Sequence, residues 1–193
     1  GIPNFTGGNV ELTDNGYIRK LTFYYKADNY LNIWNVLTPG DLFIDVGANN
    51  NWNYVVDTLG QTSSGSYGLY SSTTGFSNYI LSNQTRDWSG YDIRDNHPVG
   101  IMNLSGASIT ADFSGWVTPS SREQLVTSTF DFSGLPEGGI YTGSEDFILS
   151  WTTNCANDVI YGEIAHPVPE PSTMLMLGSG LLALLGLRKK FKK

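Results

Sequence analysis

Cysteine and histidine are scarce in this chain, and their scarcity excludes several kinds of chemistry. Among 193 residues there are one cysteine, Cys155, and two histidines, His97 and His166. Structural zinc sites take four cysteine or histidine ligands at regular spacings, which three scattered residues cannot supply. Nucleophilic catalysis needs a base beside the nucleophile, and the sequence has no Gly-x-Ser-x-Gly elbow. We therefore expect no enzyme, and no cofactor other than a hard cation.

Cys155 has no second cysteine with which to form a disulfide inside the chain. In an oxidising compartment a single cysteine is either buried and inert or free to pair with another molecule. Cys155 is therefore the candidate for a covalent link between copies of the chain, in a filament for example.

Basic residues are also rare outside the last six positions. Residues 1–187 hold six basic and eighteen acidic side chains, a formal net charge of −12. Such a chain repels the phosphate backbone, so nucleic acid is not an expected partner. With 22 glycines, 13% aromatic residues and only 15% charged residues, the composition is typical of a β-rich extracellular domain.

Helical periodicity is lacking up to residue 165, and strand patterns take its place. Leu21, Phe23 and Tyr25 alternate with polar residues over 17–26, as in a half-buried strand. We expect hairpins at 41–57 and 147–164, turns over 1–16, a helical turn or irregular strand over 28–40, a loop with one short strand over 60–75, and further strands at 77–82, 97–104, 108–116 and 128–132. The fold class predicted for residues 1–165 is all-β, an antiparallel β-sandwich or jelly-roll-like domain.

The remaining residues form three consecutive segments. Residues 166–171 are a Pro-rich linker, 172–187 are uncharged and mostly apolar, and 188–193 are basic, with Arg188, Lys189 and Lys190 at their start. As a helix the apolar segment reaches about 24 Å, a little short of a hydrocarbon layer of about 30 Å. We expect a single transmembrane helix with a basic cytoplasmic tail, and the preceding domain outside the cytoplasm.

This arrangement resembles the PEP-CTERM sorting signal. The resemblance rests on Val168, Pro169, Glu170 and Pro171, followed by the Leu/Gly-rich span and the Arg-Lys-Lys cluster. It implies an exported bacterial protein that is anchored in the inner membrane, processed by an exosortase and passed to the cell surface or extracellular matrix. The resemblance implies where the protein is delivered, and it implies no biochemical activity. Because the chain begins at Gly1 without an export signal, we expect a mature or truncated form.

Oxygen-rich side chains cluster in and around the first hairpin. Leu42, Ile44 and Val46 are expected on its core face, with Trp52, Tyr54 and Val56 on the return strand, and Phe43 on the opposite face. Carboxylate and amide oxygens are the ligands that calcium prefers. The candidate calcium ligands are Asp41, Asp45, Asn49, Asn51 and Asp57. Asparagine is also frequent in tight turns because it tolerates left-handed backbone, so the cluster has a purely structural alternative.

Aromatic residues offer platforms for carbohydrate. We single out Trp88 and Tyr91, although tryptophan is more often packed in or near a core. Three functions stay open: a structural or adhesive protein of an exopolysaccharide-associated surface or biofilm, a carbohydrate-binding module or glycan-acting enzyme delivered by the same route, and a filament subunit. Exosortase, the membrane and exopolysaccharide are the expected partners.

Overall fold

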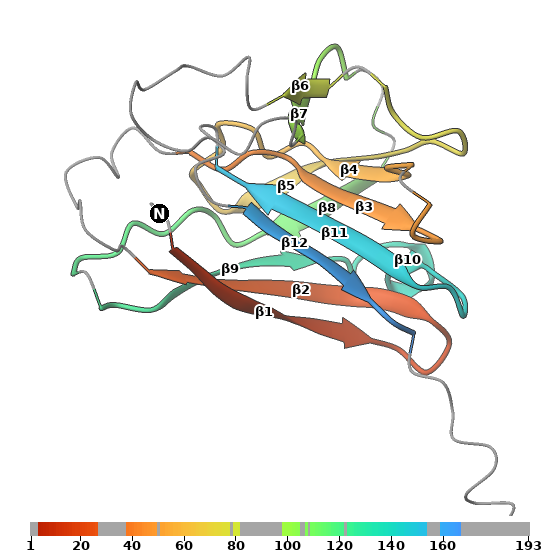
Figure 1. Cartoon of the computed structure of the whole chain (residues 1–193), viewed down its shortest axis with the longest axis horizontal. Helices are drawn as coiled ribbons and strands as arrows, with labels where there is room; N and C mark the ends of the chain where they lie inside the picture. The colour runs from red at the N-terminus through yellow and green to blue at the C-terminus, as the bar shows by residue number, and fades with distance from the viewer. Residues whose placement is uncertain are drawn as a thin grey trace, which may run out of the picture.

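A computed structural model describes residues 4–26, 38–49, 51–77, 79–81, 98–104, 107, 109–121, 123–153 and 159–166. These residues form an all-β body with one short 3-10 turn, η3, at Pro136–Gly138 (Figure 1). The strands are β1 (Asn4–Leu12), β2 (Tyr17–Lys26), β3 (Leu42–Val46), β4 (Tyr54–Val56), β5 (Gly65–Ser71), β6 (Tyr79–Leu81), β7 (Pro98–Ile101), β8 (Ile109–Phe113), β9 (Val126–Asp131), β10 (Ile140–Tyr141), β11 (Phe147–Thr152) and β12 (Val159–Ile164).

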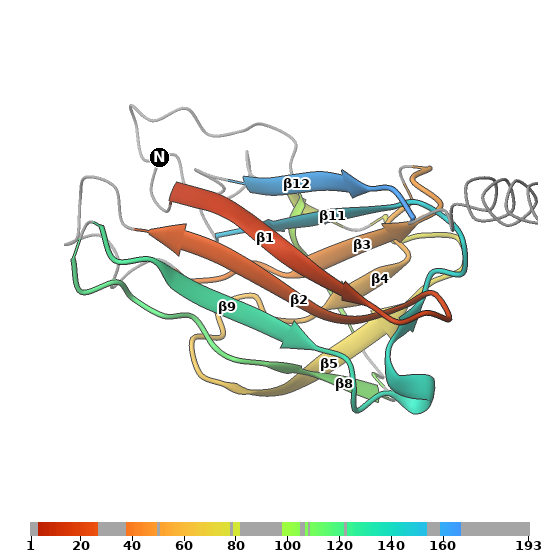
Figure 2. The ribbon, with the colours of Figure 1, turned by 90° about the horizontal axis from the view of Figure 1, so that it is seen from below.

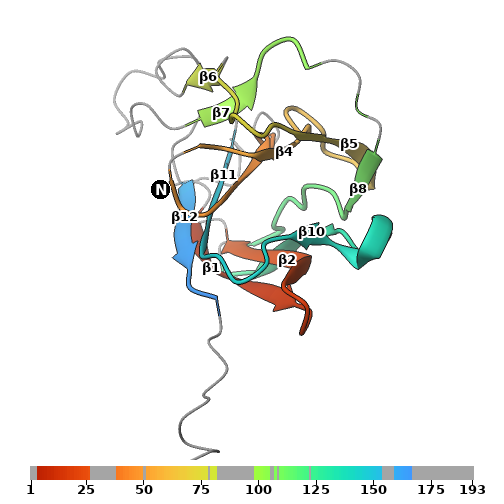
Figure 3. The same cartoon turned by 90° about the vertical axis from the view of Figure 1, so that its right-hand side faces the viewer.

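The strands join into one curled, antiparallel sheet. Its order is β1-β2-β9-β8-β5-β4-β3-β11-β12, with β10 also paired to β2, while β6 and β7 form a separate two-stranded ribbon. The sheet curves until its edge strands β1 and β12 lie next to each other (Figures 1 and 2). The all-β, antiparallel prediction is confirmed, but the body is nearly barrel-like, with one continuous sheet in place of the two packed sheets of a sandwich (Figure 3).

The two edge strands of the curled sheet run in the same direction. Neighbouring strands along the nine-strand path alternate in direction, so the first and last strands, β1 and β12, run the same way. The hydrogen-bonded path ends at these two strands, so β1 and β12 are not paired with each other. At this seam, side chains fill the gap: the Phe5 ring of β1 lies 5.6 Å from the Trp151 ring of β11, centroid to centroid.

The first sixteen residues differ most from the sequence prediction. We expected turns there, and the structure instead has the nine-residue strand β1 paired along β2. Gly7 and Gly8 lower the intrinsic strand propensity. Pairing with β2, the most strongly patterned strand, outweighs that local preference, and register shifts at Phe5/Gly7 and Glu11/Leu12 accommodate the irregular sequence. Strand β2 and the hairpins β3–β4 and β11–β12 agree with the prediction.

The core lies inside the curl. Trp151 is fully buried at its centre, and its ring lies 4.8 Å from Phe23 and 5.4 Å from Phe130. Its indole N–H donates to the Gly40 carbonyl at 3.2 Å. The inward residues of β2, β3 and β11 have the predicted alternation: Leu21, Phe23, Tyr25, Leu42, Ile44, Phe147 and Leu149.

The outward-facing residues of β3 and β11 are buried, unlike those of a strand with one face in solvent. Phe43 and Asp45 of β3 and Ser150 of β11 point away from the inner core, yet none is exposed. Trp52, predicted on the core face, instead packs its ring against Phe43 at 5.6 Å and Tyr161 at 6.3 Å. A second apolar layer therefore covers this part of the sheet, and alternation along the strand does not report it.

Residues 167–193, which hold the Pro-Glu-Pro segment, the expected membrane helix and the basic tail, lie outside the described residues. In the part of the chain that is described, no helix is long and apolar enough to cross a membrane. The division into linker, membrane helix and cytoplasmic tail stays a prediction.

Candidate functional site

The body ends at an edge strand directly before the sorting segment. Strand β12 pairs with β11 in an unbroken register, with Ile164 opposite Phe147. Two residues later the His166 backbone N–H donates to the Asp146 carboxylate at 2.8 Å. The described core residues all precede this point, and the Pro-rich residues begin at Pro167. The segment expected to be processed therefore follows the last strand of the sheet.

The five predicted calcium ligands fall at two ends of the β3–β4 hairpin. Asp41 precedes β3 and Asp57 follows β4, so these two lie together, because Leu42 pairs with Val56. Asp45 lies four residues further along β3, which corresponds to about 13 Å of extended strand. Asn49 and Asn51 belong to the loop at that second end. The structure thus brings the candidates together as two groups and not as one.

At the first end, the Asp41 carboxylate is buried and accepts three backbone hydrogen bonds. Its Oδ1 accepts from Thr58 N at 2.9 Å and Leu59 N at 2.8 Å, and its Oδ2 accepts from Ile101 N at 2.9 Å. The Asp41 N–H in turn donates to Val99 O at 2.8 Å. One side chain therefore fastens the β6–β7 ribbon and the β4–β5 turn to the start of β3.

Burial raises the pKa of Asp41 to about 7 from an ordinary value of 3.8. The backbone N–H groups stabilise the charged carboxylate and so limit the rise in its pKa. The negative charge of Asp57 raises the pKa of Asp41 further. Burial also raises the pKa of Asp57. The two carboxyl groups are thus neutralised more easily than exposed aspartates.

At the second end, side-chain oxygens organise the loop itself. Asp45 Oδ2 and Asn49 Oδ1 both accept from Asn51 N, at 3.1 and 3.0 Å, and Asn53 Oδ1 accepts from Val46 N at 2.8 Å. Across the described residues, no group of three or more His, Cys, Asp or Glu side chains is placed to hold a metal ion. Calcium binding stays a prediction.

The other predicted site residues lie outside the described part of the chain. These are Trp88, Tyr91, Cys155, Val168, Pro169, Glu170, Pro171, Arg188, Lys189 and Lys190. Of the remaining tryptophans, Trp116 is 7% exposed and stacks on Tyr25, with 4.5 Å between centroids. It belongs to the core and is not a surface platform.

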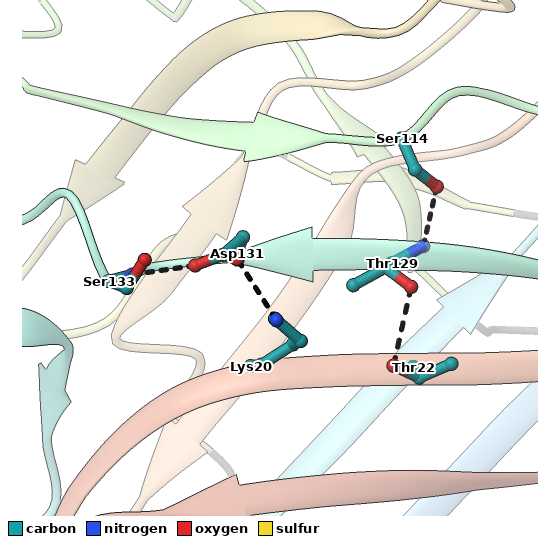
Figure 4. Close-up of polar contacts among 6 residues, drawn as sticks. All are labelled: Lys20, Thr22, Ser114, Thr129, Asp131 and Ser133. Atoms are coloured by element: carbon teal, nitrogen blue, oxygen red, sulfur yellow. Dashed lines mark hydrogen bonds and ion pairs between the residues drawn. The ribbon is translucent and has the colours of Figure 1, made fainter.

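The outer face of β2 and β9 carries a row of polar contacts, shown in Figure 4. The Lys20 ammonium lies 3.2 Å from the Asp131 carboxylate, and Thr22 Oγ1 lies 3.3 Å from Thr129 Oγ1. Ser114 Oγ accepts from Thr129 N at 2.8 Å. Partial burial works to raise the pKa of Asp131, but hydrogen bonds from Ser133 and the ion pair with Lys20 outweigh it and hold the pKa below its usual value.

Sequence reasoning missed a pair of tyrosines in contact at the end of the sheet, one half-buried and one exposed. Tyr17 of β2 and Tyr141 of β10 are directly opposite each other, with ring centroids 4.9 Å apart and planes at 49°. The Tyr17 hydroxyl donates to a Glu137 carboxylate oxygen, and this contact raises the pKa of Tyr17. The two-residue strand β10 gives no periodic pattern, so the sequence held no signal for the pair beyond its flanking glycines.

Comparison with known proteins identifies the C-terminal segment alone. Residues 167–190 match the PEP-CTERM protein-sorting motif, while the β body before them matches no family. No curated protein and no solved structure matches the chain. The motif implies an exported protein that is processed by an exosortase and sorted to the cell envelope or surface. The chain therefore carries a PEP-CTERM protein-sorting motif, as its Pro-Glu-Pro segment, apolar span and basic cluster predict.

Proposed function

We propose that this protein is a structural or adhesive component of an exopolysaccharide-associated bacterial surface or biofilm. In this proposal residues 172–187 hold the precursor in the inner membrane, an exosortase removes the tail, and the β body passes to the surface or matrix without catalysing a reaction. The observation that carries the proposal is the sorting motif at 167–190, placed directly after a body whose last strand ends at Ile164.

The boundary between body and motif supports this order of events. The described core cluster and the residues packed on it extend from Phe5 to Ile164, so loss of everything after the His166–Asp146 contact removes no part of that cluster. A body of this kind keeps its fold on either side of the processing step. The excess of acidic over basic residues further supports a role among neutral or basic surface polymers.

Sorting can be tested by substitution in the tripeptide. The chain, fused behind a bacterial export signal, is produced in a bacterium that has an exosortase and in the same strain lacking it. We expect release of the body only where the exosortase is present, and loss of release in the Pro169→Ala, Glu170→Ala double variant. His166→Ala, outside the matched residues 167–190, is the control and should be released normally.

Cell fractionation with an antibody against the body reports the outcome. Equal release in both strains, or a body that stays in the cytosol, would contradict the proposed route. An adhesive role further predicts that cells without the protein lose surface-bound polymer or cohesion, which sedimentation and polymer staining measure.

A further inference from the structure

We propose that Tyr17, Tyr141 and Glu137 form a binding site for a neutral saccharide, which we call the tyrosine platform. This inference deepens the proposed function by naming a ligand class for the body. It rests on the proposed function only for where the ligand is met, because the binding itself needs no sorting. The platform lies on β2, β10 and η3.

Neither ring belongs to the core cluster: Tyr17 is half-buried and Tyr141 is exposed to solvent. Tyr141 is 57% exposed, because successive side chains of a strand point to opposite faces. Its neighbour Ile140 does face inward and is 2% exposed. An aromatic ring held at the surface offers large, rigid contact area at low entropic cost. The C–H face of a pyranose ring covers such a surface, and its hydroxyls remain at the rim for hydrogen bonding.

The platform is rigidly mounted. The Gly16 carbonyl accepts from Thr142 N at 2.8 Å, Thr142 Oγ1 at 2.9 Å and Gly143 N at 3.2 Å. Gly16 itself has φ +77°, and a Cβ on it would lie 2.1 Å from Gly143 O, so only glycine fits. The turn before Tyr17 and the loop after Tyr141 are thereby locked together, which fixes the two rings before any ligand arrives.

Glu137 supplies a polar group beside the rings. Its backbone adopts φ 65° and ψ 5°, a left-handed conformation that non-glycine residues rarely take. This conformation directs the carboxylate to the Tyr17 hydroxyl. One carboxylate has two oxygens and about four acceptor positions, so contact with Tyr17 leaves acceptors for sugar hydroxyls. An aromatic surface bordered by a fixed acceptor is the arrangement that orients a saccharide ring.

Charge selects among saccharides. The segments 13–17 and 137–146, which build the platform, contain Asp14, Glu137, Glu145 and Asp146 and no lysine or arginine. The basic residue nearest along β2 is Arg19. A polymer of uronic acids or sulfated sugars is repelled by this surface. Neutral hexose polymers are not, and they are the ligand class that we assign.

Tyr161 provides a matched control. It is 50% exposed, close to the value for Tyr141, but lies on β12 with its ring against Trp52 and is outside the platform. Loss of a ring at Tyr161 therefore removes similar exposed aromatic area without touching the proposed site.

The test uses the full chain in a zwitterionic, sugar-free detergent, because a maltoside detergent would compete for the site. Affinity electrophoresis and calorimetry measure binding to soluble neutral glucans and mannans, with alginate as the acidic polymer and a proline-rich peptide as the protein-type ligand. We expect binding to a neutral polymer, weakened about tenfold or more by Tyr141→Ala. Tyr141→Phe should retain most of the binding, Glu137→Gln should weaken it, and Tyr161→Ala should leave it unchanged.

Three results would overturn the inference: no neutral polymer bound, equal loss in the Tyr141→Ala and Tyr161→Ala variants, or binding of alginate or the peptide in place of neutral polymers. Circular dichroism of each variant separates lost binding from lost folding. Because the assay is done on purified protein, failure here leaves the sorting route intact. Failed release from cells would equally leave the binding result standing.

Discussion

Strands β3 and β11 and strands β2 and β9 belong to the same sheet but are covered differently. Every residue of β11 is buried, and four of the five residues of β3 are. Strands β2 and β9 alternate between buried and half-exposed residues, and each has one exposed position. The first pair is enclosed on both faces, whereas the second has one face toward the core and one toward solvent.

Polar side chains make different contacts in the two regions. On the open face, Thr22, Thr129 and Asp131 contact other side chains and remain partly hydrated. On the enclosed face, Asp41 is held by three backbone N–H groups from two separate segments. A polar group shielded from water is costly unless it is hydrogen-bonded. Polar residues of the enclosed region therefore fasten chain segments, while those of the open region are available to solvent.

The largest effect is expected from truncating matched outer-face residues in the two regions. Phe43→Ala removes a fully buried ring from the outer face of β3 and should lower the free energy of unfolding by about 3–5 kcal/mol. Thr22→Ala, on the outer face of β2, should cost less than about 1 kcal/mol. Urea unfolding followed by tryptophan fluorescence compares them. Similar costs for the two variants would mean that the outer face of β3 is not enclosed.

A second prediction concerns the pH dependence of the enclosed region. The folded-state pKa of Asp41, about 7, lies above its ordinary value of 3.8. Its stabilising contribution is therefore complete below about pH 4 and is lost as the pH rises to 7, by up to about 4 kcal/mol. Asp41→Asn should flatten the stability profile between pH 4 and 7, measured as the urea midpoint at each pH.

Asp57 sharpens this test. Its negative charge contributes to the raised pKa of Asp41, so Asp57→Asn should lower the pH at which the loss of stability is complete and make that loss smaller, without abolishing it. An Asp41→Asn variant whose profile follows that of the parent between pH 4 and 7 would show that another group carries the dependence.

The smallest effect is expected on the open face. The Lys20–Asp131 pair is about one-third exposed on both sides, and exposed pairs contribute less than about 1 kcal/mol. The lowered pKa of Asp131 means that this contribution is present above pH 4 and is lost as the pH falls through the folded-state value. A double-mutant cycle with Lys20→Ala and Asp131→Asn at pH 7 and 0.1 M salt measures it. A coupling above about 2 kcal/mol would be incompatible with an open face.

The sequence predicts what depends on local pattern and misses what depends on distant partners. The alternation in β2 and the two hairpins were readable because their core residues recur every second position. Strand β1 was missed because its glycines suit turns, and only pairing with β2 makes it a strand. The enclosed outer face of β3 depends on segments that arrive from elsewhere in the chain, such as Ile101 against Asp41.

The candidate sites follow the same rule. The sorting motif is contiguous in sequence, so its residues alone identified it, and the match at 167–190 confirms it. The tyrosine platform joins residues 17, 137 and 141, which come together only through the β2–β10 pairing. The proposed calcium ligands are close in sequence but are divided between the two ends of a hairpin, because an extended strand separates its ends.

The claim that an exosortase separates this body from its tail is tested most directly by the intact mass of the protein released from exosortase-containing cells. The account predicts a folded product that retains β12 and ends within or close to the Pro-Glu-Pro segment, without the apolar span and the basic cluster. A released product that retains residues 172–193, or a chain found only in the cytosol, would contradict it.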